Sequence, residues 1–61
     1  RAEDFLFSLG FTDFRVRLSN GAARLQFPEN QLPRLLERRA EILRELKKTY
    51  SAVMLDLEVR K

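Results

Sequence analysis

The dipeptide Asn20-Gly21 lies between two runs of alternating apolar and polar residues, and no other feature limits the fold of this chain as strongly. Alternation with a period of two is typical of strands that have one buried face, and here it covers residues 14–18 and 23–27. Asn-Gly favours a two-residue type I′ turn, because both positions of that turn require a positive φ. The sequence therefore predicts a β-hairpin.

A two-residue turn also determines which residues face each other across the hairpin. The predicted pairs are Ser19 with Ala22, Leu18 with Ala23, Arg17 with Arg24, Val16 with Leu25, Arg15 with Gln26, and Phe14 with Phe27. Every apolar residue then meets an apolar partner, so the turn chemistry and the side-chain pattern support the same register.

Apolar residues at helical spacing predict one helix before the hairpin and one after it. The first covers residues 2–9 and ends at Gly10, a residue type suited to the left-handed position that follows a helix. The second begins with Asn30 as its N-cap and runs to Tyr50. Residues 52–60 alternate again and predict a third strand.

These elements predict an α+β fold with the order helix-strand-strand-helix-strand, in one small domain covering residues 1–61. We expect a right-handed crossover that brings the third strand beside the first, giving a sheet order of 2-1-3 with both helices on one face. The face expected under the helices consists of Phe14, Val16, Leu18, Leu25, Phe27, Val53, Leu55 and Leu57.

Composition excludes most catalytic chemistry from this stretch. The chain of 61 residues contains no Cys and no His, which removes disulfides, thiolate nucleophiles, imidazole bases and the usual zinc sites. The net charge of +3 is too small to argue for nucleic acid by itself. No apolar run is long enough to span a bilayer, and Glu3 and Asp4 stand where a signal peptide is basic. We expect a cytoplasmic domain, not catalytic alone, excised from the carboxy-terminal part of a larger enzyme.

The face of the sheet without helices is where function is expected. It carries Arg15, Arg17, Arg24 and Gln26 from the hairpin, with Asp56 and Glu58 from the last strand. Directly opposed arginines destabilise a strand pair unless something negative lies between them. Two interpretations remain open: a site for the phosphate or carboxylate of a ligand, which guanidinium groups suit, or a solvated patch in which the two acids supply the negative charge.

Four segments together resemble the carboxy-terminal region of the LarE-like family, the PP-loop ATP-dependent sacrificial sulfur transferases of nickel-pincer nucleotide biosynthesis. They are Ser8-Leu9-Gly10-Phe11, Phe14-Arg15-Val16-Arg17, Ala23-Arg24-Leu25-Gln26 and Leu55-Asp56-Leu57. The resemblance covers nearly the whole chain, and its motifs are moderately specific because no single piece is rare.

The resemblance implies an accessory domain of such an enzyme. The amino-terminal PP-loop domain of the family binds ATP with Mg²⁺ and adenylates a carboxylate of a pyridinium mononucleotide; sulfur then comes from a sacrificed cysteine or an iron–sulfur-bound source. Arg15 and Arg17 match the family's "RVR" motif and would hold the phosphate or carboxylate of the nucleotide, while Arg24 matches the next arginine motif and would orient them. The PP-loop domain is the implied partner, and the parent enzyme could form a homo-oligomer.

Two other classes of function remain as alternatives. One is a weak RNA-binding module, although the predicted polar face carries arginines without an aromatic residue for base stacking. The other is an interaction or oligomerisation domain that packs through this face or through the long helix. Salt-sensitive binding to many RNA sequences would favour the first, and self-association without any effect of ligands would favour the second.

Overall fold

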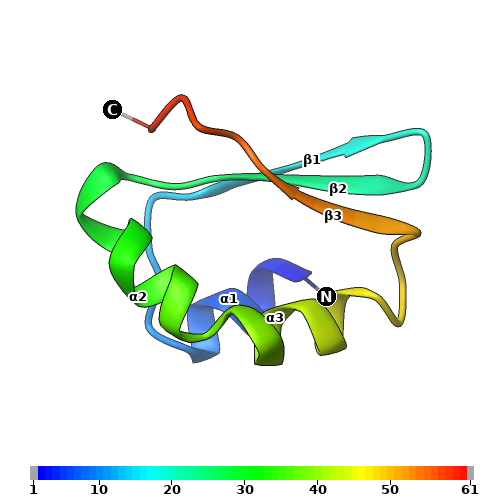
Figure 1. Ribbon diagram of the computed structural model, residues 1–61, viewed down its shortest axis with the longest axis horizontal. Coiled ribbons are helices and arrows are strands. Elements are labelled where there is room, and N and C mark those ends of the chain that lie inside the picture. The colour runs from blue at the N-terminus through cyan, green and yellow to red at the C-terminus, as the bar shows by residue number, and fades with distance from the viewer. Residues whose placement is uncertain (1, 61) are drawn as a thin grey trace.

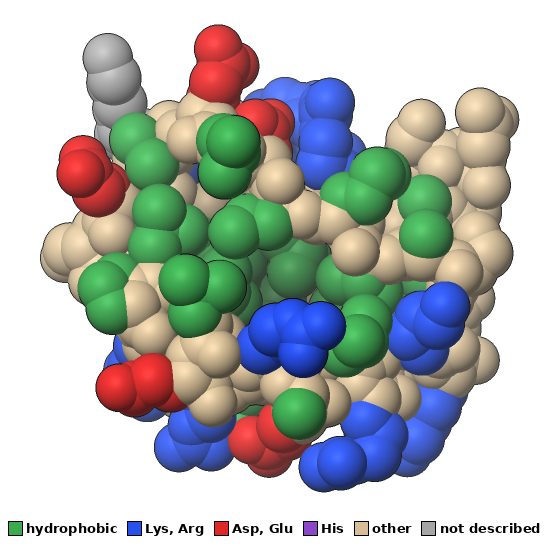
Figure 2. Space-filling view, in the orientation of Figure 1, with side chains coloured by type: hydrophobic (Ala, Val, Ile, Leu, Met, Phe, Trp, Pro, Cys, Tyr) green, Lys and Arg blue, Asp and Glu red, His purple; other side chains and the backbone are tan. Residues whose placement is uncertain are grey.

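The computed structural model describes residues 2–60 and arranges them in two layers, a sheet of three strands and a layer of helices that covers one of its faces (Figure 1). The elements in chain order are α1 (Ala2–Ser8), β1 (Arg15–Ser19), β2 (Ala22–Gln26), the 3₁₀ helix η1 (Glu29–Gln31), α2 (Leu32–Glu37), α3 (Arg39–Leu46) and β3 (Ala52–Leu55). In the same view, hydrophobic side chains fill the space between the layers and reach the surface there (Figure 2). The predicted α+β fold is confirmed.

The hairpin forms in the predicted register. β1 and β2 are antiparallel, and the pairs from Arg15 with Gln26 to Ser19 with Ala22 are those expected from the turn. Asn20 and Gly21 have φ values of 49° and 81°, as a type I′ turn requires. One step beyond the ladder, the rings of Phe14 and Phe27 stack with their centroids 5.3 Å apart.

The predicted sheet order 2-1-3 is wrong, because β3 lies beside β2 and the order is β1-β2-β3. β3 runs parallel to β2, with Ala22 opposite Ala52 and Leu25 opposite Leu55. Burial explains the choice of neighbour. A central strand loses solvent on both edges, and β2 supplies the buried Ala22, Ala23 and Leu25, whereas β1 is exposed from its third residue onward.

The predicted long helix is interrupted. Asn30 lies inside η1 instead of capping a helix, and α2 and α3 meet at Arg38, where φ is −97° and ψ is 14°. Leu35 is buried before this break and Ile42 after it. The apolar residues therefore keep their helical spacing across the break, and the spacing alone does not reveal the bend.

The side-chain amide of Gln31 makes two hydrogen bonds to the backbone of Thr12. Its oxygen accepts the Thr12 N–H at 3.0 Å, and its nitrogen donates to the Thr12 carbonyl at 2.8 Å, which connects η1 to the segment before β1.

The third strand is shorter than predicted. It ends at Leu55, because the Asp56 carboxylate accepts the backbone N–H of Glu58 at 2.9 Å and turns the chain. Leu57, expected under the helices, is 85% exposed, and Leu18 at the open end of β1 is 69% exposed. The other six residues predicted for the covered face lie in the core or pack against it.

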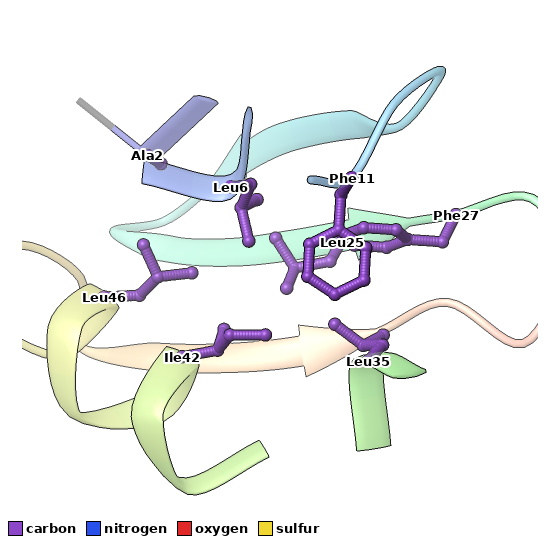
Figure 3. Packing of buried hydrophobic residues seen from close by; sticks show 8 residues of the cluster. All are labelled: Ala2, Leu6, Phe11, Leu25, Phe27, Leu35, Ile42 and Leu46. Atoms are coloured by element: carbon purple, nitrogen blue, oxygen red, sulfur yellow. The ribbon is translucent and has the colours of Figure 1, made fainter. Parts of the chain in front are cut away.

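The core lies between the sheet and the helices, where side chains from both layers converge (Figure 3). Its buried members are Ala2, Leu6, Phe11, Leu25, Phe27, Leu35, Ile42 and Leu46. Phe11 follows the end of α1, which Gly10 terminates with φ 93°, as the sequence predicted. The ring of Phe11 meets that of Phe27 edge to face at 5.1 Å. Phe27 therefore contacts two aromatic rings and anchors the end of the central strand.

We predict a large difference between two hydrophobic truncations. Phe27→Ala should lower the free energy of unfolding by about 3–5 kcal/mol, because a fully buried ring and its aromatic contacts are lost. Leu18→Ala should change it by less than about 0.5 kcal/mol, since that side chain already lies in water. Urea denaturation followed by circular dichroism measures both changes, and equal losses would contradict the observed core.

Candidate anion-binding site

The structure brings Arg15, Arg17 and Arg24 together on the face of the sheet that the helices leave open. Leu25 points into the core, so its neighbour Arg24 points to the other side, and the hairpin pairing brings Arg17 directly opposite Arg24. All three arginines line one shallow hollow of about 480 Å³ together with Val16, Leu18 and Ser19. Because the register is set by the turn, the grouping of the three arginines is a direct consequence of Asn20-Gly21.

A fourth arginine adds positive charge near Arg15. The positive charges of Arg60, first, and of Arg17, second, lower the pKa of Arg15, with a smaller contribution from desolvation. A lowered pKa of a guanidinium reports an excess of positive charge around it; Arg15 still carries its proton at neutral pH. The alternation of residues 52–60 favours the polar face for Arg60, which is not among the predicted site residues Arg15, Arg17 and Arg24.

The acidic residues neutralise this face only in part. The closest oxygen of Asp56 lies 3.9 Å from Nε of Arg24, and the Arg24 side chain is half exposed. Such a pair contributes about 0–1 kcal/mol. Glu58, expected to be a second counterion, makes no ion pair with these arginines among the described residues, and its backbone carbonyl accepts a hydrogen bond from the Gln26 side chain at 3.0 Å. The interpretation of this face as a solvated ion-pair patch is therefore supported by one long contact, between Arg24 and Asp56.

The side chains of this face are of the kind that suits anion binding. Guanidinium groups donate parallel hydrogen bonds to phosphate or carboxylate, and an anion between Arg17 and Arg24 would remove the repulsion of their cross-strand pair. Between residues 2 and 60 no group of three or more Asp, Glu, His or Cys side chains could hold a metal ion. The hollow is open to water, so its electrostatic interactions are screened and affinity for a small anion should be modest.

Comparison with known proteins adds no assignment: a scan against protein-family models finds no match, and a search of curated proteins finds no significant relative. Within the described part of the chain, no helix combines the length and the apolar character needed to cross a bilayer. The arginine face is therefore the feature of this chain that bears on its function.

The opposed arginines generate a prediction about stability. Arg17→Gln should raise the free energy of unfolding by about 0.2–1 kcal/mol at low ionic strength, because it removes a like-charged cross-strand pair. The gain should disappear in 1 M NaCl, where the Debye length is only about 3 Å. Urea titrations at both salt concentrations test this, with Arg44→Gln on the exposed side of α3 as a control. A loss of stability that does not depend on salt would show that the two guanidinium groups support the fold.

Proposed function

We propose that this domain binds the phosphate or carboxylate group of a nucleotide on the open face of its sheet. The observation that carries the proposal is the grouping of Arg15, Arg17 and Arg24 around one hollow, where a single long ion pair joins Arg24 to Asp56. Nothing in the core requires these charges, since the buried side chains are all apolar within the described residues. A surface selected only for folding would separate or pair them, so an external anion is the natural counterion.

The spacing of the arginines suits such a ligand. Arg15 and Arg17 are two residues apart on one strand, so their Cα atoms are about 6.5 Å apart and their side chains point to the same side. Two flexible guanidinium groups at that separation can converge on one phosphate, and Arg24 reaches it from the neighbouring strand. Arg15 and Arg17 would therefore bind the anion, and Arg24 would orient them or share the contact.

The resemblance to the LarE-like family supports a more specific role. On that basis the domain is the accessory carboxy-terminal domain of an ATP-dependent sulfur transferase of the nickel-pincer nucleotide type, and the anion belongs to a pyridinium mononucleotide. ATP, Mg²⁺ and the sulfur donor would be held by the PP-loop domain, its proposed partner. The domain itself would position substrate without performing a chemical step, and it would do so in the cytoplasm. Arg15 and Arg17 occupy the "RVR" positions on which this proposal depends.

An RNA-binding role has weaker support. Proteins that bind single-stranded RNA stack bases on aromatic side chains, and the described open face of the three strands presents none. Only attraction to the phosphate backbone would remain, and it would fall steeply with salt.

We predict selective binding of a mononucleotide to the arginine face. In an amide-resolved NMR titration at constant ionic strength, nicotinic acid mononucleotide should shift the signals of Arg15, Arg17 and Arg24 and should bind more tightly than inorganic phosphate. The reason is that the mononucleotide offers a phosphate and a carboxylate to several guanidinium groups at once. Arg15→Gln should weaken binding, whereas Arg44→Gln, which lies outside this face, should not.

A short RNA at the same ionic strength is the comparison ligand. If mononucleotide, phosphate and RNA all bind alike, or if none shifts the arginine signals, the proposed selectivity for a nucleotide substrate is wrong. Shifts from phosphate alone would preserve an anion site and remove the nucleotide from the proposal.

A further inference from the structure

β3 is an edge strand with one side unpaired. It pairs with β2 alone, and no fourth strand lies beside it within residues 2–60. An edge strand presents backbone N–H and C=O groups that can pair with another extended chain, and proteins usually cover or charge such edges. The residues of β3 are Ala52, Val53, Met54 and Leu55, so this edge carries neither a charged residue nor a proline.

An apolar groove lies against this edge. It separates β3 from α2 and α3, has a volume of about 240 Å³, and is lined by Leu35, Leu36 and Leu43 from the helices and by Val53, Met54 and Leu55 from the strand. Leu36 and Met54 are 59% and 45% exposed. Figure 2 shows hydrophobic side chains gathered around a hollow on this side of the molecule. The edge therefore offers both backbone pairing and room for apolar side chains.

The groove contains one charge, and this charge restricts what can occupy it. Arg39, the first residue of α3, lines the groove among these apolar residues. No acidic residue lines the groove, and among the described residues Arg39 has no carboxylate within ion-pairing distance, unlike its neighbour Arg38, which pairs with Glu41 at 3.1 Å. An occupant with a carboxylate among apolar side chains would complement the groove in charge and in polarity.

A second copy of the chain fits this groove less well. A symmetric dimer through β3 would use the same surface on both copies, so it would bring two Arg39 side chains toward one twofold axis with no acid of the groove lining between them. A partner that supplies the acid avoids this repulsion.

We propose that the free edge of β3 and the adjoining groove bind an extended segment of a partner protein, which adds as a strand and places a carboxylate against Arg39. Backbone pairing along β3 provides affinity, and alternate side chains of the segment enter the groove and provide specificity. The segment would be apolar on one face and would carry an Asp or Glu on that face. No arginine of the proposed nucleotide site lines this groove, although Met54 lies opposite Arg24 in the pairing of β3 with β2, and the proposal does not depend on that site.

The test uses two synthetic peptides of eight residues in which valine alternates with threonine. In one peptide a central valine is replaced by glutamate, and in the other by glutamine. The glutamate peptide should shift the amide signals of Val53, Leu55 and Arg39 and should bind about two- to fivefold more tightly than the glutamine peptide, as expected for a half-exposed ion pair. Arg39→Gln should remove this preference, and Arg44→Gln on the same helix should keep it.

Both peptides are also compared on the unsubstituted chain, so the difference between their affinities tests the proposal even if the Arg39→Gln variant folds poorly. Equal binding of the two peptides, shifts confined to the free edge of β1, or no binding at millimolar concentration would overturn the proposal. So would concentration-dependent broadening of the β3 signals without peptide, because the occupant would then be a second copy.

Discussion

The pairing of β2 on both of its edges is the constraint on which the rest of the structure depends. β1 is connected to β2 by the Asn20-Gly21 turn and pairs with it in antiparallel orientation. β3 pairs with the other edge of β2 in parallel orientation, and η1, α2 and α3 form the connection between these two strands. This central position buries Leu25 and Phe27 against side chains from all three α-helices. A domain of this size has little other apolar surface to bury, so β2 and the residue that follows it, Phe27, determine where the helices pack.

The same strand determines the chemistry of the opposite face. Side chains alternate along β2, so burial of Leu25 directs Arg24 outward, and the hairpin register then brings Arg17 opposite it. The repulsion between Arg17 and Arg24 does not stabilise the fold. The 3.9 Å contact between Arg24 and Asp56 offsets only a small part of this repulsion. The concentration of positive charge is thus a cost that the hairpin imposes, and an anion bound there would offset it.

Local patterns predicted those parts of the structure that depend on neighbouring residues. The hairpin, its register and the grouping of Arg15, Arg17 and Arg24 follow from turn chemistry and alternation within one short segment. The neighbour of β3 depends on which strand can be buried on both edges, which alternation alone does not specify. The end of β3 depends on the Asp56 side chain competing for a backbone donor, a contact invisible to periodicity. The alternation of residues 52–60 favours the polar face for Arg60, but its approach to Arg15 depends on the path of the chain after that turn, which residue spacing does not specify.

The central claim is that the arginine face is kept for an anion. The most direct measurement is urea unfolding in millimolar phosphate against chloride at equal ionic strength, with the variant R15Q/R17Q/R24Q as the reference for general salt effects. The account predicts that phosphate raises the stability of the unsubstituted chain and leaves the variant unchanged. The gain should be about 1.4 kcal/mol at ten times Kd, because only the folded face can bind. Equal responses of the two chains would show that the arginines hold no anion and that this face is a solvated surface.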